Sequence, residues 1–138
     1  MSEQRKPVLT GGCQCGAVRY ALSTRPERAG ICHCRMCQKA VGGPFFAWAA
    51  VAETDLAWTR GAPALFASSS AAERGFCARC GGNLFWRHTT PGTDHTAIMA
   101  GSIDPPTRLR LARHIFVASK SDYYDITDAA SQHAEWPT

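Results

Sequence analysis

The sequence predicts an all-β fold made of short antiparallel strands with little helix. Segments rich in aromatic and β-branched residues recur along the chain, and turns containing glycine or proline separate them. Closely spaced cysteines lie beside glycines in several of these turns, which indicates that bound metal stabilises the domain. Because no long helical pattern alternates with the strands, a parallel βαβ architecture is not expected.

Each element follows from a local pattern. Apolar and polar residues alternate in "AVRYALS", residues 17–23, as they do in a half-buried strand. "PFFAWAAV", residues 44–51, is typical of a buried strand, and residues 74–88 predict a strand, a knuckle and a second strand. Further strands are expected at 55–61, 62–69, 95–103 and 114–120, loops at 24–30 and at the start of 104–113, and helical turns in 38–43 and in the tail, 125–138.

Length and composition indicate one globular domain, residues 1–138. Hydrophobic residues make up 45% of the chain, so it can bury a core, but no run of 18 apolar residues could span a membrane. The N-terminal "MSEQRKPVLTGG" lacks the apolar stretch of a secretory signal, and we therefore expect a cytoplasmic protein. In that reducing compartment, seven cysteines favour metal binding or chemistry over disulfide bonds.

The formal charge of +4 is weak evidence for a nucleic-acid partner. If all seven cysteines are thiolates on two Zn²⁺ ions, the formal charge falls to +1. The basic residues are scattered, except that Arg108, Arg110 and Arg113 lie close together in "TRLRLAR". Binding to nucleic acid is therefore not expected.

The seven cysteines form three groups: Cys13 and Cys15; Cys32, Cys34 and Cys37; and Cys77 and Cys80. The last pair has zinc-knuckle spacing and needs a partner pair. Cys13 and Cys15 would point to one face of an extended segment and can supply it. Alternatively, Cys34 and Cys37 could complete a zinc ribbon with the knuckle, or the cysteines could be buried without metal. The first pairing is preferred because it leaves the other three cysteines together in one loop.

Three cysteines in "CHCRMC", residues 32–37, predict a second kind of site. A structural zinc ion has four protein ligands, whereas a catalytic one keeps three and leaves a position for water or substrate. A soft external thiol suits that position and would be held as a thiolate. A helix that begins near Arg35 would direct its first backbone N–H groups at the sulfurs.

Residues near the three cysteines have competing interpretations. Arg35 and Lys39 could meet a carboxylate of the ligand, but solvated surface charge explains them equally well. His33 alternates away from its cysteine neighbours in an extended chain, so we expect it to form hydrogen bonds or pack in the core. Four aromatic residues could wall the site, although core packing is expected for most of them: Phe45, Phe46, Trp48 and Trp86.

The segments "GGCQCGAVRY", "CHCRMCQKAVGGPFFAWAAV", "FCARCGGNLFW", "AGSID" and "HIFVASK", in this order, resemble the glutathione-dependent formaldehyde-activating enzyme family. That family also includes the centromere protein V group, and the resemblance covers about residues 11–136. It implies a β-tent fold and two Zn²⁺ ions per chain. The implied ligands are Cys13, Cys15, Cys77 and Cys80 for a structural ion, and Cys32, Cys34 and Cys37 for a second, catalytic ion.

The resemblance also implies an activity, the joining of formaldehyde to glutathione to give S-(hydroxymethyl)glutathione. The reverse reaction breaks a carbon–sulfur bond, so the protein would be a carbon–sulfur lyase whose partner is a small thiol such as glutathione. Two alternatives remain open. One is a non-catalytic zinc module that binds a protein or nucleic acid, and the other is a redox-sensing cysteine cluster that releases its ion on mild oxidation.

Overall fold

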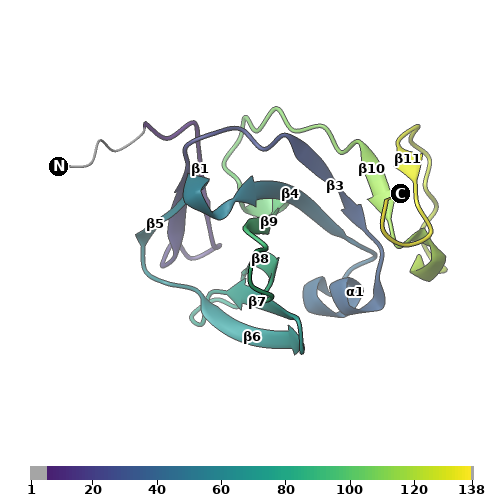
Figure 1. Cartoon of the computed structure of the whole chain (residues 1–138), viewed down its shortest axis with the longest axis horizontal. Helices are drawn as coiled ribbons and strands as arrows, with labels where there is room; N and C mark the ends of the chain where they lie inside the picture. Colours follow the sequence, from purple (N-terminus) through teal and green to yellow (C-terminus); the bar gives the residue numbers. More distant parts are fainter. Residues whose placement is uncertain (1–5, 138) are drawn as a thin grey trace.

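The computed structural model of the protein describes residues 6–137 and contains two β-sheets (Figure 1). The smaller sheet is antiparallel and consists of β1 (Leu9–Gly12), β2 (Arg19–Leu22) and β5 (Leu56–Arg60), in the order β1-β2-β5. The larger sheet has the order β11-β10-β3-β4-β9-β8-β7-β6. Its strands are β3 (Arg28–Cys32), β4 (Phe46–Ala52), β6 (Ala64–Ser69), β7 (Ala72–Phe76), β8 (Asn83–His88), β9 (His95–Met99), β10 (Arg113–Ile115) and β11 (Ser131–Gln132).

The predicted all-β class with little helix is confirmed. Within residues 6–137, the helical elements are one α-helix and three short 3₁₀ turns: α1 (Arg35–Val41), η1 (Glu53–Asp55), η2 (Ala100–Ser102) and η3 (Val117–Ser119). Most strand pairs are antiparallel, but β10 runs parallel to both β3 and β11. None of the helices described is long and apolar enough to cross a membrane.

Four local predictions were wrong. The strand expected at 95–103 ends at Met99, and the 3₁₀ turn η2 follows it. The loop expected at 24–30 ends early, because Arg28 already pairs with Ala50 and begins β3. The strand expected at 114–120 stops at Ile115, because Phe116 has a φ of 57°, and η3 follows it. The tail contains the short strand β11 instead of a helical turn, because Ser131 and Gln132 pair with β10.

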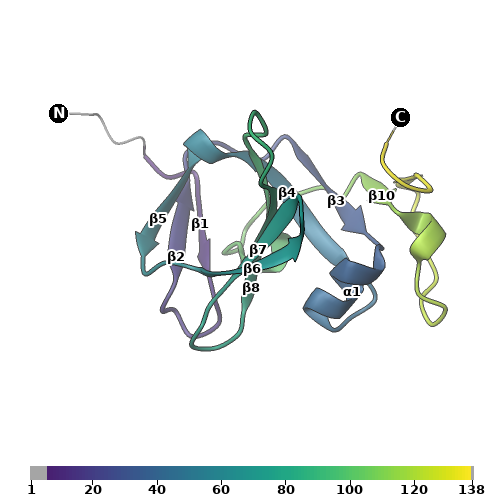
Figure 2. The same cartoon turned by 60° about the horizontal axis from the view of Figure 1, so that its bottom comes forward.

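The core lies between the two sheets, on one face of the larger sheet. Tyr20 and Leu22 of the smaller sheet are fully buried in a cluster with Val51, Phe85 and Ile98 of the larger sheet. Figure 2 shows the smaller sheet beside the middle strands of the larger one. Because side chains alternate along a strand, the neighbouring positions of β3, β4, β8 and β9 point to the opposite face. That second face carries the candidate site.

Candidate functional site

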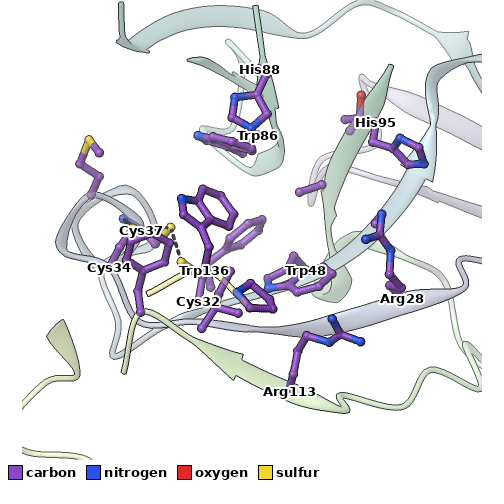
Figure 3. Close-up of a pocket in the computed structure, with 18 of the residues that line it drawn as sticks. Arg28, Cys32, Cys34, Cys37, Trp48, Trp86, His88, His95, Arg113 and Trp136 are labelled. Carbon is purple, nitrogen blue, oxygen red and sulfur yellow. Dashed lines mark hydrogen bonds between the residues drawn. The ribbon is translucent and has the colours of Figure 1, made fainter. Parts of the chain in front are cut away.

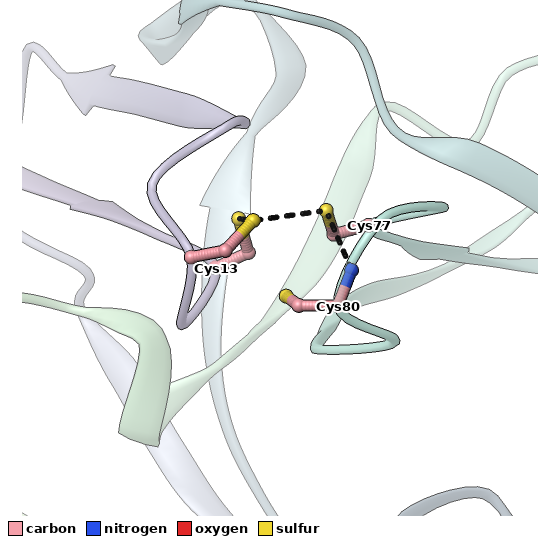
Figure 4. A group of neighbouring side chains, drawn as sticks. Cys13, Cys77 and Cys80 are labelled. Carbon is pink, nitrogen blue, oxygen red and sulfur yellow. Dashed lines mark hydrogen bonds between the residues drawn. The ribbon is translucent and has the colours of Figure 1, made fainter.

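The first cysteine cluster joins the end of β1 to the turn between β7 and β8 (Figure 4). The Sγ atoms of Cys13, Cys15, Cys77 and Cys80 all lie within 4.8 Å of one another. The Sγ atom of Cys15 lies 3.7 Å from that of Cys13 and 3.8 Å from that of Cys77. Tetrahedral zinc places its sulfur ligands about 3.8 Å apart, so this donor set fits a soft divalent ion.

Backbone N–H groups support these thiols. The amide of Val18 donates to Sγ of Cys13 at 3.3 Å, and the amide of Arg79 donates to Sγ of Cys77 at 3.4 Å. Burial opposes ionisation of Cys13, but the Val18 amide and the neighbouring thiols outweigh it and lower the pKa of Cys13 to about 6. Gly81 follows the last cysteine with a φ of 77°, a conformation that lets the knuckle turn back into β8. These hydrogen bonds and the lowered pKa favour binding of a cation by the four sulfurs.

The second cluster contains Cys32, Cys34 and Cys37, at the end of β3 and the start of α1. The Sγ atom of Cys37 lies 2.9 Å from that of Cys34 and 3.4 Å from that of Cys32. These separations are shorter than the ~3.8 Å of a tetrahedral zinc site, so ion binding requires the thiols to part by less than about an ångström. Interactions with the neighbouring thiols of Cys32 and Cys37 lower the pKa of Cys34, which favours a thiolate. This donor set also fits a soft cation.

Backbone and side-chain contacts hold the three-cysteine loop in place. Cys34 is the N-cap of α1, and its Sγ accepts a hydrogen bond from the Cys37 amide at 3.3 Å. The buried Gln38 amide donates to the backbone oxygens of His33 at 2.6 Å and Ser119 at 2.9 Å. The loop is thereby tied to η3.

His33 points away from the sulfurs, as predicted, and begins a buried chain of hydrogen bonds. The Asp128 carboxylate accepts from Nε2 of His114 at 3.0 Å, which leaves Nδ1 of His114 to accept from Nε2 of His33 at 2.8 Å. Both imidazoles are fully buried. Burial, together with His114, lowers the pKa of His33 to about 4. His33 therefore supports the loop as an uncharged side chain.

A buried arginine lies against the three cysteines. Arg74 of β7 is only 6% exposed, and its guanidinium donates to Sγ of Cys37 at 3.5 Å and to Oγ of Ser68 at 3.1 Å. A buried cation needs a nearby negative charge. Three thiolates on a divalent ion carry a net charge of −1, which the guanidinium would balance.

The second cluster opens into a pocket of about 340 Å³ on the outer face of the larger sheet (Figure 3). Cys32, Cys34 and Cys37 line one end, and Arg28, Arg113 and His95 lie at the other. The walls between the two ends are mainly aromatic: Phe46, Trp48, Trp86, Phe116 and Trp136. The volume is within the range of small-molecule sites, about 300–1,000 Å³.

Of the residues suggested by the sequence, some line the pocket and others lie outside it. Cys34 and Cys37 cluster with Cys32 and not with the knuckle, so the zinc-ribbon alternative is wrong. Phe46, Trp48 and Trp86 line the pocket, whereas Phe45 packs against His33 and Tyr124 on the other side. Neither Arg35 nor Lys39 lines it, and Arg35 donates to Gln38 instead.

Several contributors to the pocket were not found from the sequence, among them Arg28, Arg74, Arg113 and Trp136. Arg28 and Cys32 lie four residues apart in β3 and so share a face, but residues 24–30 were interpreted as a loop. Arg113 was grouped with Arg108 and Arg110, which are exposed and lie outside the pocket. The alternation of side chains along β3 was the signal that could have revealed Arg28.

A sequence model of the glutathione-dependent formaldehyde-activating enzyme family matches residues 8–119. The chain belongs to this family. It is 30% identical over 132 residues to a Halomonas elongata protein provisionally named as such an enzyme, covering 86% of this chain and 81% of that protein. It is 26% identical over 125 residues to an uncharacterized lyase of Schizosaccharomyces pombe, covering 91% of this chain and 90% of the relative. The family resemblance noted in the sequence is thus confirmed.

A solved structure supports the fold. The crystal structure of a Rhodobacter sphaeroides protein matches with a TM-score of 0.56 and 22% identity, covering 70% of this chain and 88% of that one. At this identity the likeness concerns the fold alone.

Proposed function

We propose that the protein is a zinc-dependent carbon–sulfur lyase that acts on the adduct of a glutathione-like thiol with formaldehyde. Family membership and the lyase and formaldehyde-activating names of its relatives support this proposal. One structural observation carries it. Four cysteines form a cluster of their own, and the remaining three line a small-molecule pocket. This division is the one expected of a closed structural site beside an open reactive one.

The two clusters would have different roles. Cys13, Cys15, Cys77 and Cys80 would hold a structural zinc ion, and Cys32, Cys34 and Cys37 would hold the second. When bound, the second ion would keep the sulfur of the substrate ionised at neutral pH. Arg74 would stabilise the negative charge of the sulfurs around that ion. Trp48, Trp86 and Trp136 would exclude water from the reacting sulfur.

The proposed step balances without a redox partner. In synthesis, the thiolate sulfur attacks the carbonyl carbon of formaldehyde and forms the carbon–sulfur bond. The electron pair of the carbon–oxygen double bond moves to oxygen, which takes up one proton, the equivalent of the one the thiol released. The product is the S-hydroxymethyl thioether, and its cleavage follows the same steps in reverse.

Exchange of labelled formaldehyde between its free and glutathione-bound forms tests the proposal. We expect the protein with two zinc ions to accelerate this exchange, measured by ¹³C exchange spectroscopy. Cys34→Ser should abolish the acceleration, and circular dichroism should show that the variant remains folded. Arg110→Gln, an exposed substitution outside the pocket, is the control and should retain full activity. Exchange that is no faster than in buffer would refute the proposed function.

A further inference from the structure

We propose that Arg28 and Arg113 form a carboxylate-binding subsite, so that the pocket selects thiols that also carry a carboxylate. That the ligand's sulfur binds at the three-cysteine cluster rests on the proposed function above, whereas the carboxylate subsite rests on separate residues. The ligand class is a peptide-like thiol with an acidic group a few bonds beyond the sulfur. Neutral thiols of similar size lack that group.

Strand geometry places the two arginines at defined distances from the cysteines. Arg28, Gly30 and Cys32 lie on the same face of β3, because they are every second residue of the strand. The Cα atom of Cys32 is about 7 Å from that of Gly30 and about 13 Å from that of Arg28. Arg113 is two residues before Ile115, which pairs with Cys32, so Arg113 lies level with Gly30. The two guanidinium groups therefore lie at the far end of the same groove (Figure 3).

Gly30 creates the room for this arrangement. A Cβ atom added there would lie 2.8 Å from the Trp48 ring and 2.9 Å from Cγ of Arg113. The indole and the arginine stem therefore both lie over the bare backbone of β3. Between its two ends the pocket is lined by the small side chains of Ala50 and Ala97, which leave space for a ligand. A peptide-sized ligand could lie along this part of the pocket.

The positive charges of Arg28 and Arg113 are not paired with a negative side chain in the described part of the protein. Among the described residues, the guanidinium groups of Arg28 and Arg113 have no ion-pair or hydrogen-bond partner, and no carboxylate lines this pocket. By contrast, Arg19 pairs with Asp104 and Arg87 pairs with Glu73. Nε of Arg113 and Nε1 of Trp48 are buried without a partner in the described chain. A ligand would reach these two atoms only if their side chains shift, so the subsite rests on the unpaired guanidinium groups that line the pocket.

A carboxylate matches these donors. A guanidinium binds a carboxylate through two parallel hydrogen bonds, and such charge-assisted bonds are stronger than neutral ones. A second, more polar hollow of about 370 Å³ adjoins this end and shares Arg28, Ala50 and His95 with the pocket. Glu27 and Asp55 also line that hollow and would repel a second carboxylate, so the proposed subsite holds one carboxylate, at the end of the pocket itself.

Binding of S-methylglutathione to the zinc-loaded protein tests the subsite without the thiol or the reaction. This thioether keeps both carboxylates but has no sulfur that can ionise. We expect it to quench tryptophan fluorescence, because Trp48 and Trp86 line the pocket. Its diamide, in which both carboxylates are neutral and nearly unchanged in size, should bind at least about tenfold more weakly.

Substitutions assign the effect to the two arginines. Arg28→Gln and Arg113→Gln should each weaken S-methylglutathione about tenfold, while Arg28→Lys should recover part of the loss. Arg110→Gln, the control, should bind like the parent. Because Arg113 is partly buried, the exposed Arg28 provides the decisive variant if Arg113→Gln does not fold.

The outcomes separate the two proposals. Equal binding of the acid and the diamide, or unchanged binding in Arg28→Gln, would overturn the subsite, and formaldehyde exchange could still occur. Arginine-dependent binding without any formaldehyde exchange would support the subsite and refute the proposed reaction.

Discussion

The guanidinium of Arg74 lies 3.5 Å from Sγ of Cys37, and three residues later the same chain segment supplies Cys77 to the other cysteine cluster. Strand β7 therefore contacts both clusters. Arg74 points from it to the outer face of the larger sheet, and Cys77 follows its last residue. One short strand therefore joins the four-cysteine cluster to the three-cysteine cluster.

Arg74→Met should weaken the affinity for the second ion about 10–100-fold, the range found when an outer-shell partner of a metal ligand is removed. Methionine fills much of the same buried space but cannot balance the negative sulfurs. Competition with a chromogenic chelator measures this affinity. Ser68→Ala removes the other partner of Arg74 and is the control, which should change the affinity little. Unaltered affinity in Arg74→Met would show that the arginine has no electrostatic role.

The two cysteine clusters should differ in their effect on folding. Cys13→Ser or Cys77→Ser should unfold the protein, because zinc binding at a closed site contributes about 10 kcal/mol or more to folding. Cys34→Ser should leave a folded protein with one zinc ion per chain. Metal analysis combined with circular dichroism distinguishes these results. A folded Cys77→Ser variant and an unfolded Cys34→Ser variant would reverse the assignment of the two sites.

Gly75→Ala should destabilise the core by about 1–3 kcal/mol, the usual cost of overpacking. The added Cβ atom would lie 2.1 Å from the ring of Phe85, which is itself buried in the core. Gly101→Ala is the matched control, because nothing lies within 4 Å of its Cβ position. Urea unfolding gives both free energies. Equal stabilities of the two variants would contradict the packing described here.

Stability should fall in alkali partly because of Tyr20. Burial raises the pKa of Tyr20 to about 12, from the usual tyrosine value of 10.0. The folded protein therefore holds this proton more tightly than the unfolded chain, and the contribution present below pH 10 is lost as the pH rises towards 12.

Comparison with Tyr20→Phe isolates this contribution, because other groups titrate in both proteins. At pH 8 the variant should be less stable by about 0.5–1.5 kcal/mol, since it lacks the hydrogen bond to Ser102. The difference in unfolding free energy should narrow above pH 10. A constant difference up to pH 12 would argue against burial of the Tyr20 hydroxyl.

Local patterns were sufficient for most of the fold and for the division of the cysteines into three close groups. They left two ways of joining these groups open, and the family resemblance favoured the one that the structure shows. Alternation in 17–23 and the aromatic run in 44–51 correspond to β2 and β4, and the knuckle lies between β7 and β8. Cysteine spacing worked because ligands of one ion must be close, and residues two or three apart in a turn already are. These features depend on neighbours in sequence.

The missed features depend on contacts between distant residues. Arg74 reaches Cys37 only because the strand order brings β7 across the sheet, and Trp136 reaches the pocket because the tail bonds the residues after β10. The helical turn expected in the tail is absent from the described chain for the same reason, since pairing with β10 outweighs a weak local preference. Nothing in the local sequence encodes these contacts.

The central claim is that the three-cysteine cluster holds an ion that accepts an external thiol, and cobalt substitution tests it most directly. Cobalt in place of zinc reports its ligands through the visible spectrum. We predict that glutathione changes the spectrum of the protein with two cobalt ions, and that the change disappears in Cys34→Ser, which keeps the four-cysteine site. A spectrum that no thiol alters, or a second ion already closed by a histidine, would contradict the account and favour a non-catalytic zinc module.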